Sequence, residues 1–153
     1  MRGVYNLTAN IESVTTPKTL LWFQTPSDMV VEILSASVTN SGNATSEQLE
    51  AALLEVSTLG TPVFNVAANT KKSESGDVAM SVVASGDATT EPTTYESDPI
   101  ERKGFNNLAG WYYEPVPEER VAISPSKSVG LKLLSAPTST TFNVSIKVRE
   151  IGG

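Results

Sequence analysis

The stretch Phe142-Asn143-Val144-Ser145-Ile146-Lys147-Val148-Arg149 decides the fold class, because apolar and polar side chains alternate along its whole length. Successive side chains of a β-strand point to opposite faces, so this pattern predicts a strand with one face in a core and the other in solvent. The same period of two runs from Tyr5 to Glu12 near the start of the chain. We therefore expect strands at both ends of the chain, each tied into a sheet.

Shorter apolar runs recur between turn signals along the rest of the chain. Leu20 to Phe23 lies between two prolines, and Val129 to Leu133 alternates before a Pro-containing turn. Roughly eight to ten strands at such spacings are typical of an all-β antiparallel sandwich, and we expect a jelly-roll-like arrangement. No shift in composition marks a second domain, so we expect one domain over residues 1–153. The expected core consists of Leu7, Ile11, Trp22, Val31 or Leu34, Leu131, Leu133, Phe142, Val144 and Ile146.

Three segments need more argument. Residues 47–57 contain good helix formers, but their apolar side chains also alternate around Glu50, and a strand is the preferred interpretation. Residues 85–107 are rich in turn-forming residues, so we expect a long irregular segment that contributes to an interface. The run from 29 to 38 predicts a strand whose shared face consists of Val30, Leu34, Ala36 and Val38.

The composition excludes several kinds of chemistry. The chain has no cysteine and no histidine, so disulfides, thiolate metal sites and Ser-His or Cys-His nucleophiles cannot be built within it. Its net charge of −6 repels a phosphate backbone, and we expect no nucleic-acid partner. No run approaches the roughly 20 apolar residues of a membrane helix. We therefore expect no membrane contact, and we expect no cofactor. We also expect no metal site, because the scattered acidic residues lack the spacing of a calcium-binding loop.

Three groups of residues are candidates for contact with a partner. The aromatic run is Trp111-Tyr112-Tyr113, the mixed-charge cluster is Glu118-Glu119-Arg120, and the basic pair is Arg102-Lys103. Aromatic side chains supply contact area at protein interfaces, and exposed charges supply specificity. We expect these residues to contribute to a protein interface and not to catalysis.

Two other functions use some of the same residues. The aromatic run would form a stacking shelf in a carbohydrate-binding sandwich, unless its alternate members fill the core. A glycosidase-like enzyme would need two carboxyl groups from Glu114, Glu118 or Glu119 to converge across a cleft, which the linear sequence does not imply. We therefore expect no catalytic residues.

The C-terminal part of the chain resembles a group of small proteins from tailed-bacteriophage and prophage genomes. The shared motifs are the aromatic-Gly-Trp segment, the Pro-x-Pro-Glu-Glu-Arg turn, the Ser-Pro-Ser turn and the terminal Glu-Ile-Gly. In this sequence they are Phe105-Asn106-Asn107-Leu108-Ala109-Gly110-Trp111, Pro115-Val116-Pro117-Glu118-Glu119-Arg120, Ser124-Pro125-Ser126 and Glu150-Ile151-Gly152. The resemblance extends over most of the chain, but only these C-terminal motifs are specific.

This resemblance implies a structural component of a virion, with no catalytic residues to transfer. The implied function is that of a capsid decoration, or cement, protein, which binds the outer capsid surface and bridges capsid subunits. Its partners would be the major capsid protein and itself, as a homotrimer. It would be made in the bacterial cytoplasm. We expect the same from the sequence, because no targeting signal is visible in it. The alternative is a tail, neck or fibre-associated module.

Overall fold

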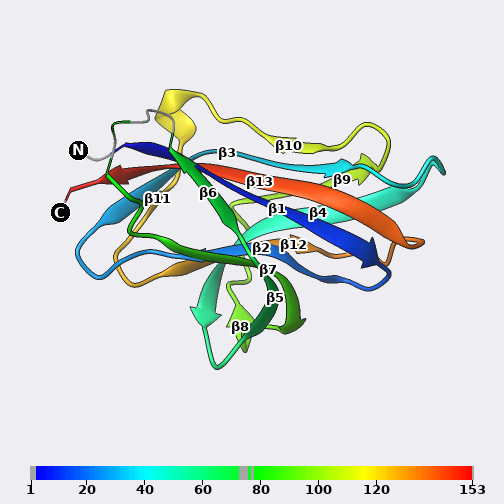
Figure 1. Cartoon of the computed structure of the whole chain (residues 1–153), viewed down its shortest axis with the longest axis horizontal. Coiled ribbons are helices and arrows are strands. Elements are labelled where there is room, and N and C mark those ends of the chain that lie inside the picture. Colours follow the sequence, from blue (N-terminus) through cyan, green and yellow to red (C-terminus); the bar gives the residue numbers. More distant parts are fainter. Residues whose placement is uncertain (1–2, 73–75, 77, 153) are drawn as a thin grey trace.

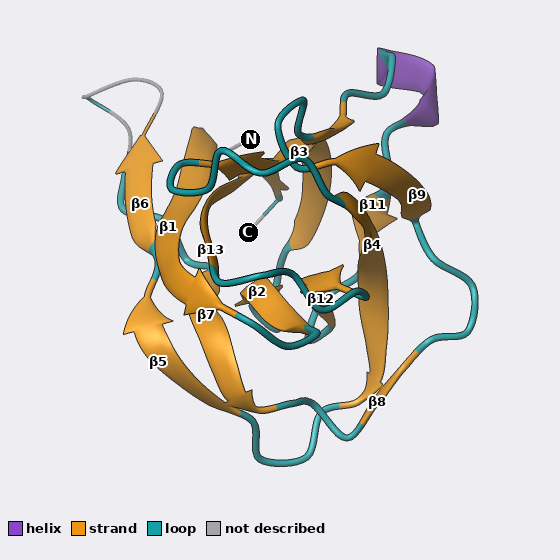
Figure 2. Cartoon of the chain, turned by 90° about the vertical axis from the view of Figure 1, so that its right-hand side faces the viewer, coloured by secondary structure: helices purple, strands orange, loops and turns teal. Residues whose placement is uncertain are grey.

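The computed structural model describes residues 3–72, 76 and 78–152, and it confirms the all-β sandwich. Two antiparallel sheets pack face to face (Figures 1 and 2). The described residues form thirteen strands and one short 3₁₀ helix. This exceeds the expected strand number because the strands Asn69–Lys72, Thr94–Tyr95 and Glu101–Asn106 lie in polar stretches that show no regular alternation.

The two sheets, A and B, differ in which parts of the chain they contain. Sheet A contains, in spatial order, β10 (Trp111–Tyr113), β3 (Val30–Asn40), β13 (Thr140–Ile151), β1 (Val4–Val14) and β6 (Asn69–Lys72), and β11 (Ala122–Ile123) also pairs with β3. Sheet B contains β5 (Val63–Ala67), β7 (Val83–Thr90), β2 (Lys18–Gln24), β12 (Ser128–Leu133), β4 (Gln48–Thr58) and β8 (Thr94–Tyr95), and β9 (Glu101–Asn106) also pairs with β4. The 3₁₀ helix η1 (Pro117–Glu119) follows β10.

The first and last strands form the centre of sheet A. Ile146 of β13 lies opposite Leu7 of β1, and Val144 lies opposite Ala9, with all four side chains buried. The polar residues between them face outward, as the alternation predicts. The expected core is confirmed at Leu7, Ile11, Trp22, Val31, Leu131, Leu133, Phe142, Val144 and Ile146, all of which are buried.

Strand β3 departs from its expected pattern at one point. Its register to β13 shifts at Leu34, which has no pairing partner between Ile33 and Ser35. An extra residue of this kind reverses the phase of the alternation. The buried side chains of β3 are Val31, Ile33, Ala36 and Val38. The expected shared face, which ran from Val30 through Leu34, is therefore wrong on the N-terminal side of the bulge.

Two ambiguous segments both form strands. The strand interpretation of residues 47–57 is confirmed by β4. Residues 85–107, expected to be irregular, instead contain most of β7 and all of β8 and β9. Gly86, one of the turn-forming residues in this range, lies within β7, where an added Cβ would be 2.7 Å from the backbone oxygen of Leu20. A close approach between strands, and not a turn, explains this glycine.

A buried carboxylate fastens the segment before β7 to the end of β13. The Glu150 side chain is fully buried, and its Oε1 accepts the backbone N–H groups of Ser81 at 2.7 Å and Val82 at 3.0 Å. Nearby, the Tyr5 hydroxyl donates to the backbone carbonyl of Val78 at 3.0 Å. A hydrogen bond to a charged acceptor contributes about 1.5–3 kcal/mol. These contacts hold the chain in place where it enters sheet B.

We expect Glu150→Leu to lower the free energy of unfolding by about 3 kcal/mol, because the buried Val82 N–H and the partly buried Ser81 N–H would both lose their acceptor. Glu150→Gln keeps one acceptor oxygen at nearly the same volume and should lose about half as much or less. Urea unfolding followed by tryptophan fluorescence measures both variants. Equal losses in the two variants would show that the acceptor oxygen is not what holds the segment.

Candidate functional site

The candidate residues that the structure brings together lie where β9 of sheet B contacts β10 of sheet A. A cleft of about 360 Å³, which we call the β9–β10 cleft, opens there. It is lined by Ile100, Glu101, Lys103, Tyr113, Glu114, Pro115, Glu119 and Val121. Of the eight residues predicted as interface candidates, it includes Lys103, Tyr113 and Glu119.

The aromatic run on β10 alternates between the core and the surface. Trp111 pairs with Val38 of β3 and is fully buried, and Tyr113 pairs with Ala36 and is 7% exposed. Tyr112 lies between them and is 46% exposed. The run therefore forms no shelf of three exposed rings, since two of its members anchor β10 to the core.

Lys103 connects the two sheets at this point. It lies on β9 opposite Ala51 of β4, and its Nζ donates to the backbone carbonyl of Tyr112. The same Nζ is 5.4 Å from the ring centre of Trp111. A cation over an aromatic ring contributes about 0.5–1 kcal/mol at an exposed site. A lysine at a sheet edge also discourages pairing with the strand of another molecule.

The other member of the basic pair does not join the site. Arg102 pairs with Glu50 of β4, and this ion pair raises the pKa of the Arg102 guanidinium. Arg102 and Lys103 diverge because successive residues of a strand point to opposite faces. The basic pair is therefore divided between an ion pair on sheet B and the β9–β10 cleft.

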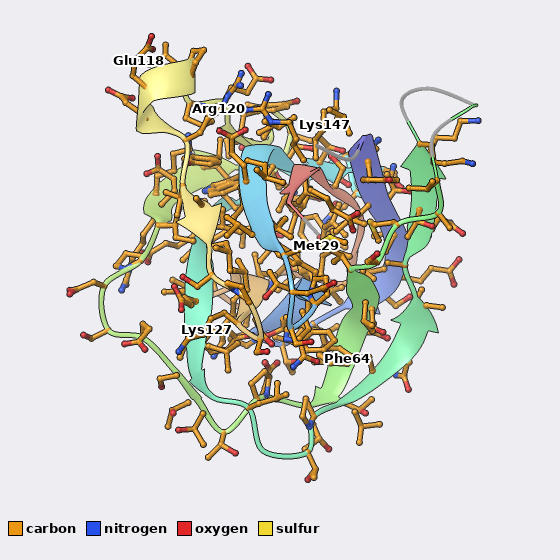
Figure 3. The ribbon with its side chains drawn as sticks, turned by 90° about the vertical axis from the view of Figure 1, so that its left-hand side faces the viewer. Met29, Phe64, Glu118, Arg120, Lys127 and Lys147 are labelled. Carbon is orange, nitrogen blue, oxygen red and sulfur yellow. The ribbon has the colours of Figure 1, made fainter. Side chains whose placement is uncertain are left out.

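The mixed-charge cluster lies on and just after η1. Pro117 begins this helix, where its missing N–H costs nothing, and the Glu119 N–H donates to the Val116 carbonyl at 2.9 Å. Glu119 lines the cleft, whereas Glu118 is exposed at the outer tip of the helix (Figure 3). Arg120 follows, half-buried, and its Nε is buried without a hydrogen-bond partner in the described part of the chain.

The cleft carries more negative than positive charge. Glu101, Glu114 and Glu119 line it together with a single cation, Lys103. Burial raises the pKa of the Tyr113 phenol, and the carboxylates of Glu101 and Glu119 raise it further because they would repel a phenolate. Tyr113 therefore stays neutral at physiological pH. Within residues 3–72, 76 and 78–152, no group of three or more His, Cys, Asp or Glu side chains is placed to hold a metal ion.

Exposed apolar side chains are concentrated along the segment that contains β10. Seven large apolar side chains are exposed among the described residues, and three of them lie between residues 108 and 116. These three, which we call the apolar rim, are Leu108 (55% exposed), Tyr112 (46%) and Val116 (54%). Of the three, only Tyr112 is an interface candidate from its residue type, because Leu and Val are more often found in a core and their exposure here follows from the fold.

Comparisons with known proteins add no functional information about this site. The described part of the chain contains no helix long and apolar enough to cross a membrane. No protein-family model matches the sequence, and no curated protein or solved structure matches the chain.

Proposed function

We propose that this chain is a structural virion protein of a tailed phage, a capsid decoration protein that binds the outer capsid surface and bridges capsid subunits. One observation carries the proposal: the segment 108–120, which contains the Pro115–Arg120 turn shared with the phage group, exposes three large apolar side chains and also supplies Tyr113, Glu114, Pro115 and Glu119 to a charged cleft. Protein interfaces combine an apolar, aromatic centre with a polar, charged periphery.

The rigidity of this surface supports a binding function. The buried side chains of Trp111 and Tyr113 hold β10 on the core, and Lys103 ties β10 to β9. A surface that is already ordered loses little conformational entropy when a partner binds. Tyr112 and its neighbours are thus presented in a fixed position to the major capsid protein, and a homotrimer would present three such surfaces at once.

The charge of the cleft defines the complementary partner surface. With three glutamates and one lysine lining the cleft, the capsid contact should place basic side chains over it. Complementary charges at the periphery of an interface mainly affect the association rate and are screened by salt.

The test uses capsids from a phage or prophage in which this gene is deleted. We expect the wild-type protein to sediment with these capsids and the double variant Leu108→Ser/Val116→Ser to lose at least about tenfold in affinity, because removing two apolar contacts costs roughly 1.4 kcal/mol or more. Both positions are exposed, so the free energy of unfolding should change little.

The matched control is Val63→Ser/Val83→Ser, which removes two exposed valines from β5 and β7 of sheet B, away from the rim. This control should bind like the wild type. Absence of any binding by the folded wild-type protein, or equal loss in the rim and control variants, would refute the proposed contact.

A further inference from the structure

A second hollow lies on the outer face of sheet A, the face turned away from sheet B. This groove has a volume of about 400 Å³ and crosses strands β1, β3, β6 and β13. We call it the sheet A groove, and it is lined by Thr8, Ala9, Asn10, Ser37, Thr39, Asn69, Asn143, Val144 and Ser145. None of these side chains is ionisable, in a chain whose net charge is −6.

The strand register explains why the face is hollow. Adjacent strands place one row of residues side by side across sheet A, in the order Tyr112, Ser37, Ser145, Thr8 and Asn69. The three central side chains are small, and the longer Tyr112 and Asn69 stand at the two ends. The hydroxyl groups of Ser37 and Ser145 are 2.9 Å apart and form a hydrogen bond. Small residues between larger ones leave a trough across the sheet.

The neighbouring row supplies amide groups. The Asn10 Nδ2 donates to the Asn143 Oδ1 at 2.7 Å, and the Thr39 hydroxyl donates to the Asn143 backbone carbonyl at 3.3 Å. Each amide offers two donors and an acceptor, and each hydroxyl is both donor and acceptor. The bonds between Asn10, Asn143 and Thr39 use only part of this capacity, so the row can also serve a ligand.

Tyr112 is not one of the lining residues, but it presents an exposed ring on the strand next to Ser37, which does line the groove. Gly110, with φ of +88°, lets the ring lie over the backbone, where an added Cβ would be 3.1 Å from the ring. The position of the ring therefore depends on glycine at position 110, because other residues would adopt this backbone conformation only with strain. Because Tyr112 pairs with Ser37, the ring lies on the same face as the groove.

We propose that the sheet A groove binds a neutral oligosaccharide. Sugar hydroxyls are both donors and acceptors, which matches the hydroxyl and amide groups of the groove, and the apolar face of a pyranose ring matches an aromatic ring such as that of Tyr112. An ionic ligand would find no counter-charge among the lining residues. Lys147 and Lys71 lie in the next row, on either side of Asn6, so charge begins only beyond the groove.

The experiment is an amide chemical-shift titration of the protein with maltohexaose, cellohexaose and chitohexaose, together with an acidic hexagalacturonate. We expect at least one neutral hexasaccharide to shift amides of the groove-lining residues. Ser145→Tyr fills the trough and should weaken that binding by about tenfold or more. The matched control, Ser57→Tyr, makes the same change at an exposed position of sheet B and should bind like the wild type.

Three outcomes would overturn the proposal. The first is no groove shift with any neutral probe at millimolar concentration. The second is binding of the acidic probe alone, abolished by Lys147→Gln, which would identify an anion site. The third is a shift of the same amides with protein concentration in the absence of sugar, which would assign this face to a second copy of the chain. The Leu108→Ser/Val116→Ser variant should bind the sugar normally, so this test is independent of capsid binding.

Discussion

Replacing Trp111 with alanine should lower the free energy of unfolding by about 3–5 kcal/mol, a large part of the total stability of a domain of this size. Trp111 is the largest of the fully buried side chains among the described residues, although it lies on a strand of only three residues at the edge of sheet A. Its removal would leave a cavity under β10 and release the strand that carries Tyr112. Urea unfolding monitored by circular dichroism measures the loss.

Trp111→Phe is the control that separates volume from hydrogen bonding. The Trp111 Nε1 is buried and has no hydrogen-bond partner within the described residues. Phenylalanine therefore loses packing but no hydrogen bond, and the loss should be smaller than that of the alanine variant. If Trp111→Ala destabilised the protein by less than about 1 kcal/mol, β10 would not be anchored to the core as described.

Replacing Ile146 with alanine should cost about 2–5 kcal/mol. Ile146 lies in the middle of β13, fully buried, between Leu7 of β1 and Ala36 of β3. Loss of its side chain leaves a cavity in the centre of sheet A, where neighbouring strands on both sides limit collapse. Thermal and urea unfolding measure the effect.

The neighbouring residue provides the control for this prediction. Lys147 is exposed on the outer face of the same strand (Figure 3), so Lys147→Ala should change the free energy of unfolding by no more than about 0.5 kcal/mol. Near-normal stability of Ile146→Ala would contradict the placement of the last strand in the core.

The parts of the fold that sequence alone predicts are those with long, regular alternation. In β1 and β13 the pattern persists over most of the strand, so strand type, inward face and core residues such as Leu7 and Phe142 all follow from it. The strand at 48–58 is also predicted, because its position between strands outweighs the helix propensity of its residues.

Other parts of the fold depend on contacts between distant segments. The bulge at Leu34 is set by the pairing of β3 with β13, and a single strand's sequence does not show where a partner's register shifts. Gly86 suggests a turn, but its φ lies in the ordinary range and a close strand contact requires it. Composition signalled irregularity over 85–107, whereas tertiary pairing gave strands there.

The candidate site shows the same division. Aromatic and charged residue types identified Tyr113, Lys103 and Glu119, all of which line one cleft. Residue type did not reveal that Arg102 pairs with Glu50 on the other face. The sheet A groove was not foreseen at all, because Ser, Thr and Asn are common on exposed strands and become a site only when four strands align them.

The central claim, that this chain decorates a phage head, is tested most directly by mass spectrometry of purified virions, with the copy number measured relative to the major capsid protein. The proposal predicts a fixed ratio to the capsid subunit and, for a head built of hundreds of such subunits, correspondingly many copies per particle. A few copies per particle would move the protein to the neck, tail or fibre, and its absence from the particle would contradict a virion function altogether.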